Sequence, residues 1–236
     1  MSADESAHDY AAANKKIFDK KAAENTAIPA ELSVLARAVT GALLLTYPTL
    51  FDRTKTELLD FACGAGLVAL ELAPHVRSVL GVDISEGVVE RFNERAAELG
   101  AAHARAVAAR LDTGDGAPEA CATLEGATFD VVLCSFSYHH VASIAATTRT
   151  LARFLRPGGA LLVLDTLRRS DTAPVEEIPE EFRPAVAHVG GFTEAQMREA
   201  FEAAGLVGFE FGEAMTKTIM GREQTLFIAK GVSPQL

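Results

Sequence analysis

The chain has 236 residues, of which 49% are hydrophobic, and it carries a formal charge of -10. This length and apolar content suit one substantial α/β domain. The acidic balance disfavours nucleic acid as a partner, because polyanions are held largely through Lys and Arg contacts to phosphates. No apolar run approaches the roughly 18 residues that a membrane span requires, which predicts no membrane partner.

The cysteines and the first residues indicate a reducing compartment. Cys63, Cys121 and Cys134 are widely spaced and form no C-x-x-C pair, which argues against a disulfide framework. Residues 1–9 are acidic and lack the apolar core of a secretory signal. We therefore expect a cytoplasmic protein, as a monomer or a homodimer.

Two helices are expected first in the chain. Residues 7–24 predict a helix with a sparse apolar stripe, typical of a segment that lies over a site rather than inside a core. Pro29 suits the first turn of a second helix, whose apolar residues keep helical spacing. We expect residues 1–50 to form a lid and packing helices, and residues 51–236 to form one globular domain.

From residue 57 onwards, segments with strand and helix patterns alternate. The expected strands are 57–61, 77–82, 102–107, 129–134 and 160–165, and the expected helices are 64–73, 86–99 and 142–155. Alternation of this kind predicts a parallel sheet, which binds ligands beyond the carboxyl ends of its strands.

The alternation of strand and helix patterns ends after residue 166. The proline-rich and acidic stretch 166–191 predicts an excursion over the active-site face, with a short helix near 179–187. A capping box at Thr193 then opens a helix over 194–204. The segments 206–212 and 224–231 are expected as the last strands.

A glycine-rich turn follows the first expected strand. Gly64 and Gly66 allow the backbone to approach a ligand closely, and glycine adopts the required dihedral angles at little cost. Asp83 ends the second strand, where an acid accepts hydrogen bonds from ribose hydroxyls. A carboxylate at Asp60 would repel a pyrophosphate and attract a cation. The pattern therefore predicts a nucleoside site without a place for phosphate.

Four segments in this order resemble the class I S-adenosylmethionine-dependent methyltransferases. They are the Asp60-x-x-x-Gly64-x-Gly66 loop, Gly81-Val82-Asp83-Ile84-Ser85, Phe129-Asp130-Val131-Val132-Leu133-Cys134 and Leu155-Arg156-Pro157-Gly158-Gly159. The resemblance covers roughly residues 55 to 165. It implies a Rossmann-like, seven-stranded, mostly parallel sheet with helices on both faces and an antiparallel C-terminal edge strand.

The same resemblance implies S-adenosylmethionine as the cofactor and S-adenosylhomocysteine as the product. Asp60 would help to hold the methionine end, partly by hydrogen bonding the glycine loop, and Asp83 would accept the ribose hydroxyls. Asp112 or the nearby Asp115 would accept from the adenine amino group. The full set expected at the cofactor is Tyr10, Asp60, Ala62, Gly64, Gly66, Asp83, Ile84, Leu111, Asp112 and Ser135.

Three histidines are candidates for the acceptor pocket or for a general base. His139 and His140 follow the fourth expected strand, and His188 precedes the last helix. Histidine titrates near neutral pH, which suits a base. Tyr138 is a further candidate for a substrate contact. A metal is not expected, because adjacent histidines diverge on an extended segment and no H-E-x-x-H or cysteine pair is present.

The sequence thus predicts methyl transfer to a small-molecule acceptor by in-line displacement, with the acceptor atom (O, N, S or C) left open. The resemblance is to the broad group that contains ubiquinone and menaquinone methyltransferases and secondary-metabolite enzymes. Two alternatives stay open. One is a catalytically idle cofactor-binding or scaffold protein with the same fold. The other is a dinucleotide-binding oxidoreductase, because residues 64–69 also fit G-x-G-x-x-G/A.

Overall fold

The computed structural model describes residues 8–24, 27–111, 124–169, 178–219 and 222–235. Seven strands form one sheet in the order β3-β2-β1-β4-β5-β7-β6. Strands β1 to β5 are parallel to one another, and β7 pairs antiparallel with both β5 and β6. The expected mostly parallel sheet with an antiparallel C-terminal edge is confirmed. The strands are β1 (Glu57–Phe61), β2 (Ser78–Asp83), β3 (Ala104–Ala108), β4 (Phe129–Ser135), β5 (Leu155–Thr166), β6 (Val207–Ile219) and β7 (Arg222–Val232).

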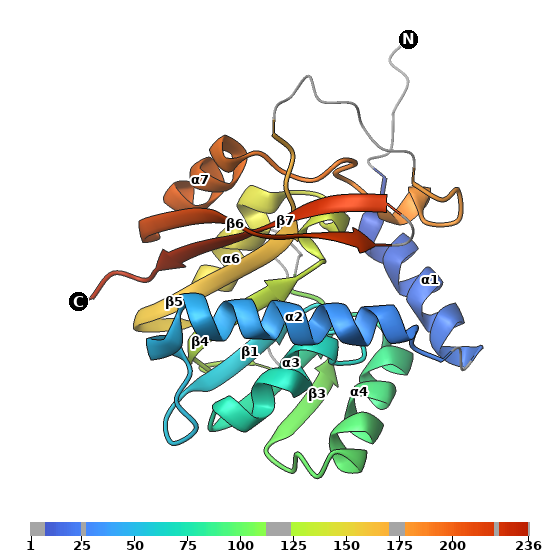
Figure 1. Cartoon of the computed structure of the whole chain (residues 1–236), viewed down its shortest axis with the longest axis horizontal. Helices are drawn as coiled ribbons and strands as arrows, with labels where there is room; N and C mark the ends of the chain where they lie inside the picture. Colours follow the sequence, from blue (N-terminus) through green and yellow to red (C-terminus); the bar gives the residue numbers. More distant parts are fainter. Residues whose placement is uncertain (1–7, 25–26, 112–123, 170–177, 220–221, 236) are drawn as a thin grey trace.

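Helices cover both faces of the sheet (Figure 1). One face packs against α2, α3 and α4, and the other packs against α6 and α7. Short 3-10 turns follow β4 (138–140) and precede α7 (183–185). The α-helices of the described residues are α1 (Tyr10–Ala23), α2 (Ala30–Thr46), α3 (Leu67–Leu72), α4 (Glu86–Glu98), α6 (Ile144–Ala152) and α7 (Glu194–Ala203).

The core lies in two layers because side chains of a strand point alternately to its two faces. On β1, Leu58 packs with α2 and α3, whereas Leu59 packs with α6 and α7. Both leucines are fully buried. Because helices cover both faces, the central strands are continuous apolar runs. Polar side chains occur at the ends of these strands, where a binding site can form.

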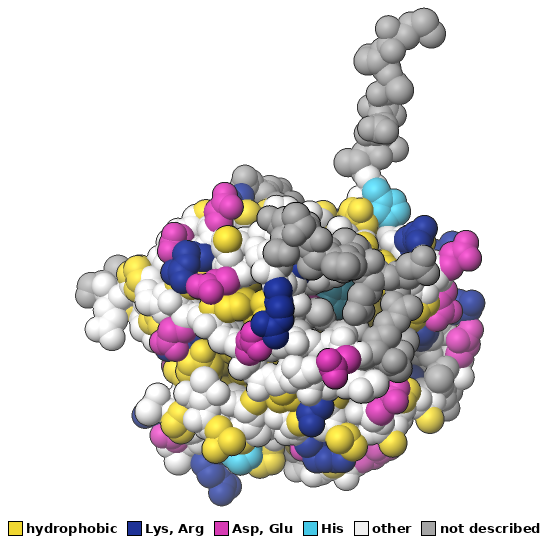
Figure 2. All heavy atoms as spheres, turned by 45° about the horizontal axis from the view of Figure 1, so that its top comes forward, with side chains coloured by type: hydrophobic (Ala, Val, Ile, Leu, Met, Phe, Trp, Pro, Cys, Tyr) yellow, Lys and Arg dark blue, Asp and Glu magenta, His cyan; other side chains and the backbone are white. Residues whose placement is uncertain are grey.

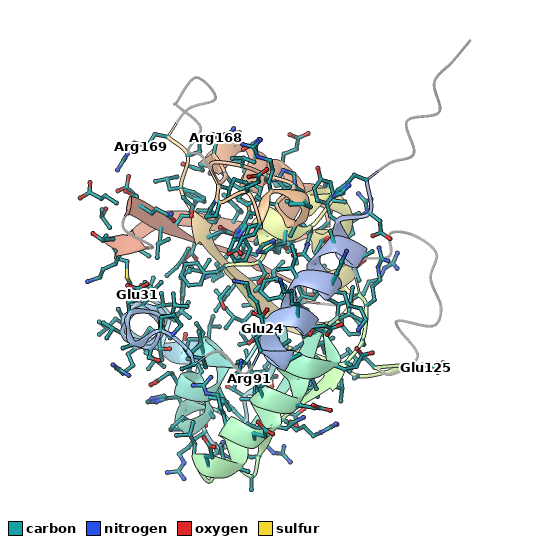
Figure 3. All side chains as sticks on the ribbon, turned by 90° about the vertical axis from the view of Figure 1, so that its right-hand side faces the viewer. Glu24, Glu31, Arg91, Glu125, Arg168 and Arg169 are labelled. Carbon is teal, nitrogen blue, oxygen red and sulfur yellow. The ribbon has the colours of Figure 1, made fainter. Side chains whose placement is uncertain are left out.

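Helix α1 lies over α4 (Figure 3). Lys15 pairs with Glu86 at the start of α4, and Asp19 accepts a hydrogen bond from the hydroxyl of Ser85. Asn14 donates to the carbonyl of Ala185 at 3.0 Å. A helix with few large apolar side chains is therefore held on the domain by polar contacts to segments far away in the sequence.

Three of the expected elements differ most from the structure. The helix near 179–187 is only a 3-10 turn over 183–185. Strand β5 begins at Leu155, because its first residue pairs with Phe129 ahead of a register shift. Strand β6 extends to Ile219, because its antiparallel pairing with β7 continues to that residue. The two longer strands owe their length to a partner strand, which the pattern of a single segment does not reveal.

The surface in Figure 2 carries charged side chains of both signs, interspersed with apolar ones. Among the residues that the structure describes, no helix is both long and apolar enough to span a bilayer.

Candidate active site

The glycine loop between β1 and α3 contains two glycines with different roles. Gly64 and Gly66 have positive φ angles of 52° and 74°. A Cβ at Gly66 would lie 2.6 Å from the ring of Phe92 in α4, so this glycine lets the loop pack on α4. A Cβ at Gly64 would meet no atom within 4 Å. Gly64 therefore borders open space, where a ligand can approach the backbone.

Two buried carboxylates lie beside this loop. Asp83 accepts hydrogen bonds from the amides of Gly64 at 2.9 Å and Ser85 at 3.0 Å. Asp60 is 2% exposed, and its Oδ1 has no hydrogen-bond partner in the structure. Asp83, rather than Asp60, thus holds the Gly64 amide, which differs from the expectation for Asp60.

Both carboxyl groups have a raised pKa. Burial raises the pKa of Asp60 well above its usual range, and the neighbouring charge of Asp83 raises it further. Burial also raises the pKa of Asp83, while hydrogen bonds from Ser85 and Gly64 oppose this effect. A ligand with a positive charge would favour the ionised form of both acids.

The unpaired Oδ1 of Asp60 and the open space at Gly64 fit S-adenosylmethionine. Leaving a buried carboxylate oxygen unpaired is unfavourable, so a cationic ligand with hydroxyl donors suits Asp60 and Asp83. A pyrophosphate at the same place would be repelled by the Asp60 carboxylate, whereas an acid at the position of Asp83 also occurs in dinucleotide sites. The charge of Asp60 therefore favours a phosphate-free cationic nucleoside over a dinucleotide, two ligand classes that the glycine pattern alone leaves open.

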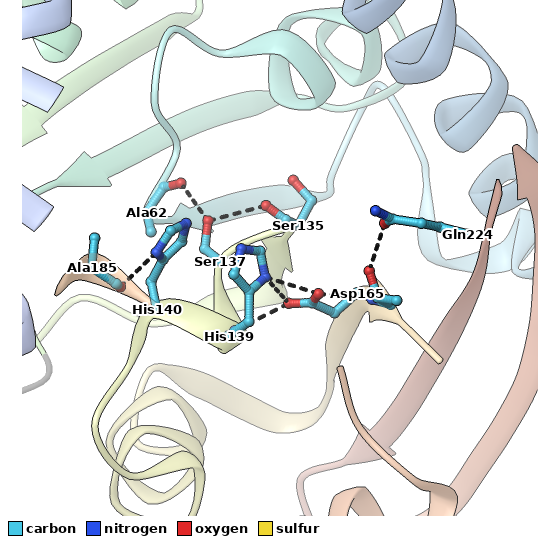
Figure 4. A network of polar contacts seen from close by, with 9 residues as sticks. Ala62, Ser135, Ser137, His139, His140, Asp165, Ala185 and Gln224 are labelled. Atoms are coloured by element: carbon cyan, nitrogen blue, oxygen red, sulfur yellow. Dashed lines mark hydrogen bonds and ion pairs between the residues drawn. The ribbon is translucent and has the colours of Figure 1, made fainter. Parts of the chain in front are cut away.

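A second loop, after β4, joins the first (Figure 4). The hydroxyl of Ser137 lies 3.3 Å from the carbonyl oxygen of Ala62 and 3.2 Å from that of Ser135. Ala62 and Phe136 both have φ near +55°, an uncommon conformation for residues other than glycine. Such backbone strain persists where the surrounding structure enforces it, and it clusters at ligand sites.

His139 pairs with Asp165, which lies near the end of β5. The ring Nδ1 is 2.9 Å from Oδ1 of Asp165, and the backbone amide of His139 donates to Oδ2 at 3.2 Å. Burial lowers the pKa of His139, but the Asp165 carboxylate more than offsets this, so the net shift is upward. The histidine therefore has a partner that favours its protonated form.

His140 and His188 have the opposite electrostatic character. Nδ1 of His140 donates to the carbonyl of Ala185 at 2.8 Å, and burial with the charge of His139 lowers the pKa of His140 to about 4. Burial also lowers the pKa of His188, whose Nε2 is buried without a partner. The rings of His139 and His140 lie only 4.2 Å apart, so the expectation that they diverge is wrong. The reason is that residues 138–140 form a 3-10 turn instead of an extended segment.

A cavity of about 490 Å³ lies in front of these histidines, within the usual size range of small-ligand sites. Helices α2 and α3, the turn after β4, the end of β5 and the segment 178–191 supply its walls. The described residues that line it are mostly apolar. The polar ones are His139, His140, Asp165, Thr166, His188 and Gln224.

The segment that carries His188 is held against β5 by a close backbone contact. Phe192 donates to the carbonyl of Thr166 at 2.9 Å, and Arg168 donates back to the carbonyl of Phe192 at 2.8 Å. Gly191 has φ +79°, and a Cβ on it would lie 2.1 Å from the Thr166 oxygen. Only glycine fits at this point of the cavity wall.

Other predicted site residues have different surroundings. Tyr138 is fully buried, with its hydroxyl 3.2 Å from that of Thr148, so its expected substrate contact is wrong. Leu111 is 2% exposed and packs in the core layer that contains Leu59. Tyr10 begins α1 and packs edge-on against His8. Ile84 lies between Asp83 and Ser85, whereas Asp112 and Asp115 lie outside the described residues.

The sequence reasoning missed Asp165 and Arg95. Asp165 ends an apolar run at the carboxyl end of a strand, so the criterion that selected Asp60 and Asp83 could also have found it. Arg95 of α4 donates to the carbonyl of Ala65 in the glycine loop, and no local pattern signals that contact. In the part of the chain that the structure describes, no three His, Cys, Asp or Glu side chains are grouped to hold a metal ion.

A mostly parallel sheet that carries a glycine loop and two buried acids at the carboxyl ends of its strands defines a Rossmann-like nucleoside-binding protein. Comparison with known families narrows this class. The methyltransferase domain family matches residues 33–209, and the chain belongs to this family. The predicted resemblance to the S-adenosylmethionine-dependent methyltransferases is confirmed.

Similar proteins support this assignment. An uncharacterised methyltransferase of Schizosaccharomyces pombe is 35% identical over 163 residues, which is 68% of this chain and 56% of the relative. A ubiquinone biosynthesis O-methyltransferase of Rhizobium johnstonii is 34% identical over 45% of this chain and 40% of the relative. The chain thus spans about half the length of the curated relatives that it matches.

Solved structures show the same fold. The magnesium protoporphyrin IX methyltransferase of Synechocystis, determined with bound S-adenosylmethionine, is 16% identical with a TM-score of 0.64, covering 97% of this chain and 99% of that one. The YcgJ protein of Bacillus subtilis is 18% identical with a TM-score of 0.60, covering 83% and 99%.

Proposed function

We propose that this chain transfers the methyl group of S-adenosylmethionine to a small, largely apolar acceptor. The observation that carries the proposal is the buried Oδ1 of Asp60, which has no hydrogen-bond partner, together with the charge of Asp83 and the open space at Gly64. When bound, S-adenosylmethionine supplies an electrophilic methyl group on a sulfonium. Family membership over residues 33–209 supports the same chemistry.

In this proposal the residues of the chain bind and orient the cofactor. Asp60 offers its free oxygen to the positively charged methionine end. Asp83 keeps acceptor capacity for two ribose hydroxyls beyond its bonds to Gly64 and Ser85. The hydroxyl of Ser137 lies within hydrogen-bond distance of the carbonyl oxygens of Ala62 and Ser135, which border the glycine loop. Ile84, Leu111 and Asp112 stay predictions for the adenine end.

The proposed acceptor site is the cavity in front of His139. Its apolar lining and volume of about 490 Å³ favour a small molecule over a polymer. We propose that residues 1–50 cover this site, with α1 held by Asn14 and Asp19 and with α2 forming part of the wall. Covering the site would exclude water and align the acceptor for in-line attack.

Titration calorimetry with S-adenosylhomocysteine tests the cofactor assignment. We expect binding by the wild type, and we expect Asp83→Ala to weaken it by about 1–3 kcal/mol, the scale of a lost polar partner. Glu199→Gln, an exposed substitution on α7, is the matched control and should bind normally. Unchanged affinity in Asp83→Ala would remove that residue from the site.

Turnover is then measured with isotope-labelled methyl donor and a panel of small apolar acceptors. Cofactor binding without any methyl transfer would favour the idle scaffold. Binding of NAD in place of S-adenosylhomocysteine would favour the dinucleotide enzyme and overturn the proposal.

A further inference from the structure

The Asp165 side chain is an ionised carboxylate in the interior of the protein. It is fully buried, yet it accepts hydrogen bonds from the ring of His139 and from the backbone amides of His139 and Thr166, the last at 2.7 Å. Burial raises its pKa, but the His139 charge and these hydrogen bonds bring the pKa below the usual value. The carboxylate is therefore a permanent acceptor at neutral pH.

This carboxylate determines the tautomer of His139. An ionised acid only accepts hydrogen bonds, so the Nδ1 atom that faces it carries the hydrogen. In the neutral ring, Nε2 then holds the lone pair. The side chain of His139 is 26% exposed and lines the cavity. Figure 4 shows its ring beside the Asp165 carboxylate. His139 can thus offer Nε2 as a base to the acceptor site, while the Asp165 carboxylate holds the ring in place.

The other titratable groups around the cavity do not share this property. His140 donates Nδ1 to a backbone carbonyl, and its pKa of about 4 keeps it neutral. Burial lowers the pKa of His188, and the charges of His139 and Arg168 lower it further. Among the described residues that line the cavity, Asp165 is the one carboxylate and there is no Lys or Arg. Of the three histidines, His139 alone has a raised proton affinity.

The lining also restricts the acceptor. The described walls offer no Lys or Arg side chain for a phosphate, and the one carboxylate is already paired with His139. Residues such as Leu32, Leu35, Phe136 and Phe182 instead present hydrocarbon. An uncharged, apolar molecule with one polar group near His139 fits these walls.

A base is needed for some acceptor atoms and not for others. A neutral amine attacks through its existing lone pair, and a thiol with a pKa near 8.5 is partly ionised without help. A phenol resembles tyrosine, with a pKa near 10, and stays protonated at neutral pH. A buried histidine–carboxylate pair therefore matches a hydroxyl acceptor.

We propose that His139 and Asp165 form a proton-accepting pair for methylation of a hydroxyl group on an apolar alcohol or phenol, an inference that rests on the proposed function. The acceptor oxygen forms a bond to the methyl carbon, and the electron pair of the sulfur–methyl bond stays on sulfur. The hydroxyl proton passes to Nε2 of His139 and then to water. His139 is the catalytic residue, and Asp165 is a positioning residue that stabilises the imidazolium.

The first test measures the pKa of His139 directly, without turnover. Ring resonances followed by NMR between pH 5 and 9 should show His139 titrating above the ordinary histidine value of about 6.5. Asp165→Asn should lower that pKa, whereas His75→Gln, at an exposed turn outside the cavity lining, should leave it unchanged. A His139 pKa that is the same in wild type and Asp165→Asn would overturn the pairing.

The second test compares acceptors of different acidity on the wild type and His139→Gln. For simple phenols and naphthols, we expect His139→Gln to lower kcat by about 100-fold or more, the scale of general-base catalysis. An acidic nitrophenol that is already ionised at pH 8 should be methylated at similar rates by both. An equal loss with both acceptors would overturn the base role, because it would indicate a purely structural effect.

Failure of this inference is distinguishable from failure of the proposed function. A wild type that binds S-adenosylhomocysteine and methylates only amines or thiols would refute the hydroxyl class and leave methyl transfer intact. A wild type that does not bind S-adenosylhomocysteine would refute the proposed function itself. His139→Gln should bind S-adenosylhomocysteine like the wild type, which verifies that the variant is folded.

Discussion

Replacing Asp60 by asparagine should make the ligand-free protein more stable and its cofactor site weaker. Asp60 is 2% exposed, lacks a partner at Oδ1 and lies beside the charge of Asp83. Asparagine has nearly the same shape and carries no charge. Because an unpaired buried polar group costs about 1–3 kcal/mol, we expect the free energy of unfolding to rise by about that amount.

The same substitution removes the charge that we assign to the cofactor. Since a hydrogen bond to a charged group contributes about 1.5–3 kcal/mol, affinity for S-adenosylhomocysteine should fall by about 10- to 150-fold. Thermal unfolding without ligand should show a Tm higher by about 2–12 °C, because a domain of this size shifts by about 2–4 °C per kcal/mol. Calorimetry supplies the affinity, with Glu199→Gln as the control.

The pH dependence gives an independent check on Asp60. The pKa of Asp60 is higher in the folded protein than in the unfolded chain. The loss of stability that this raised pKa causes is therefore absent below about pH 3.9, and it grows as the pH rises toward the pKa of the folded protein. Wild type and Asp60→Asn should therefore differ in stability more at pH 7 than at pH 5. A variant with a lower Tm than the wild type, or with undiminished affinity for S-adenosylhomocysteine, would refute the reasoning.

Three further substitutions test the structure around the cavity. Gly191→Ala should cost at least about 1–3 kcal/mol of stability, measured by denaturant unfolding, because its Cβ would collide with the Thr166 carbonyl; normal stability would contradict that close contact. Tyr138→Phe should cost about 0.5–1.5 kcal/mol in the same assay and leave acceptor KM unchanged, since Tyr138 is a core residue. Asp165→Asn should lose more unfolding free energy at pH 6 than at pH 9. The pKa of His139 is raised in the folded protein, so the His139–Asp165 ion pair contributes fully to the free energy of unfolding below the unfolded pKa of about 6.5. That contribution disappears as the pH rises through the pKa of the folded protein. A stability difference between wild type and Asp165→Asn that grows with pH would contradict this assignment.

Several features of this protein follow from local sequence alone. The alternation of apolar runs and helical patterns predicts a parallel sheet, because strand and helix periods are properties of short segments. The acids that end β1 and β2 and the glycines after β1 place a nucleoside site at the carboxyl edge, since parallel strands bring those ends together. The local pattern alone thus identifies Asp60, Gly64 and Asp83, which lie within a few residues of a strand end.

The acceptor side of the site depends on tertiary structure. His139 and Asp165 are 26 positions apart, and they meet because β4 and β5 pair in a register that sets Ser135 opposite Leu164. A strand's own pattern specifies which face is buried but not where along its neighbour it pairs. The amino-acid sequence by itself therefore determined the cofactor edge, whereas the packing of β4, β5 and the 178–191 segment decided which histidine gained a carboxylate partner.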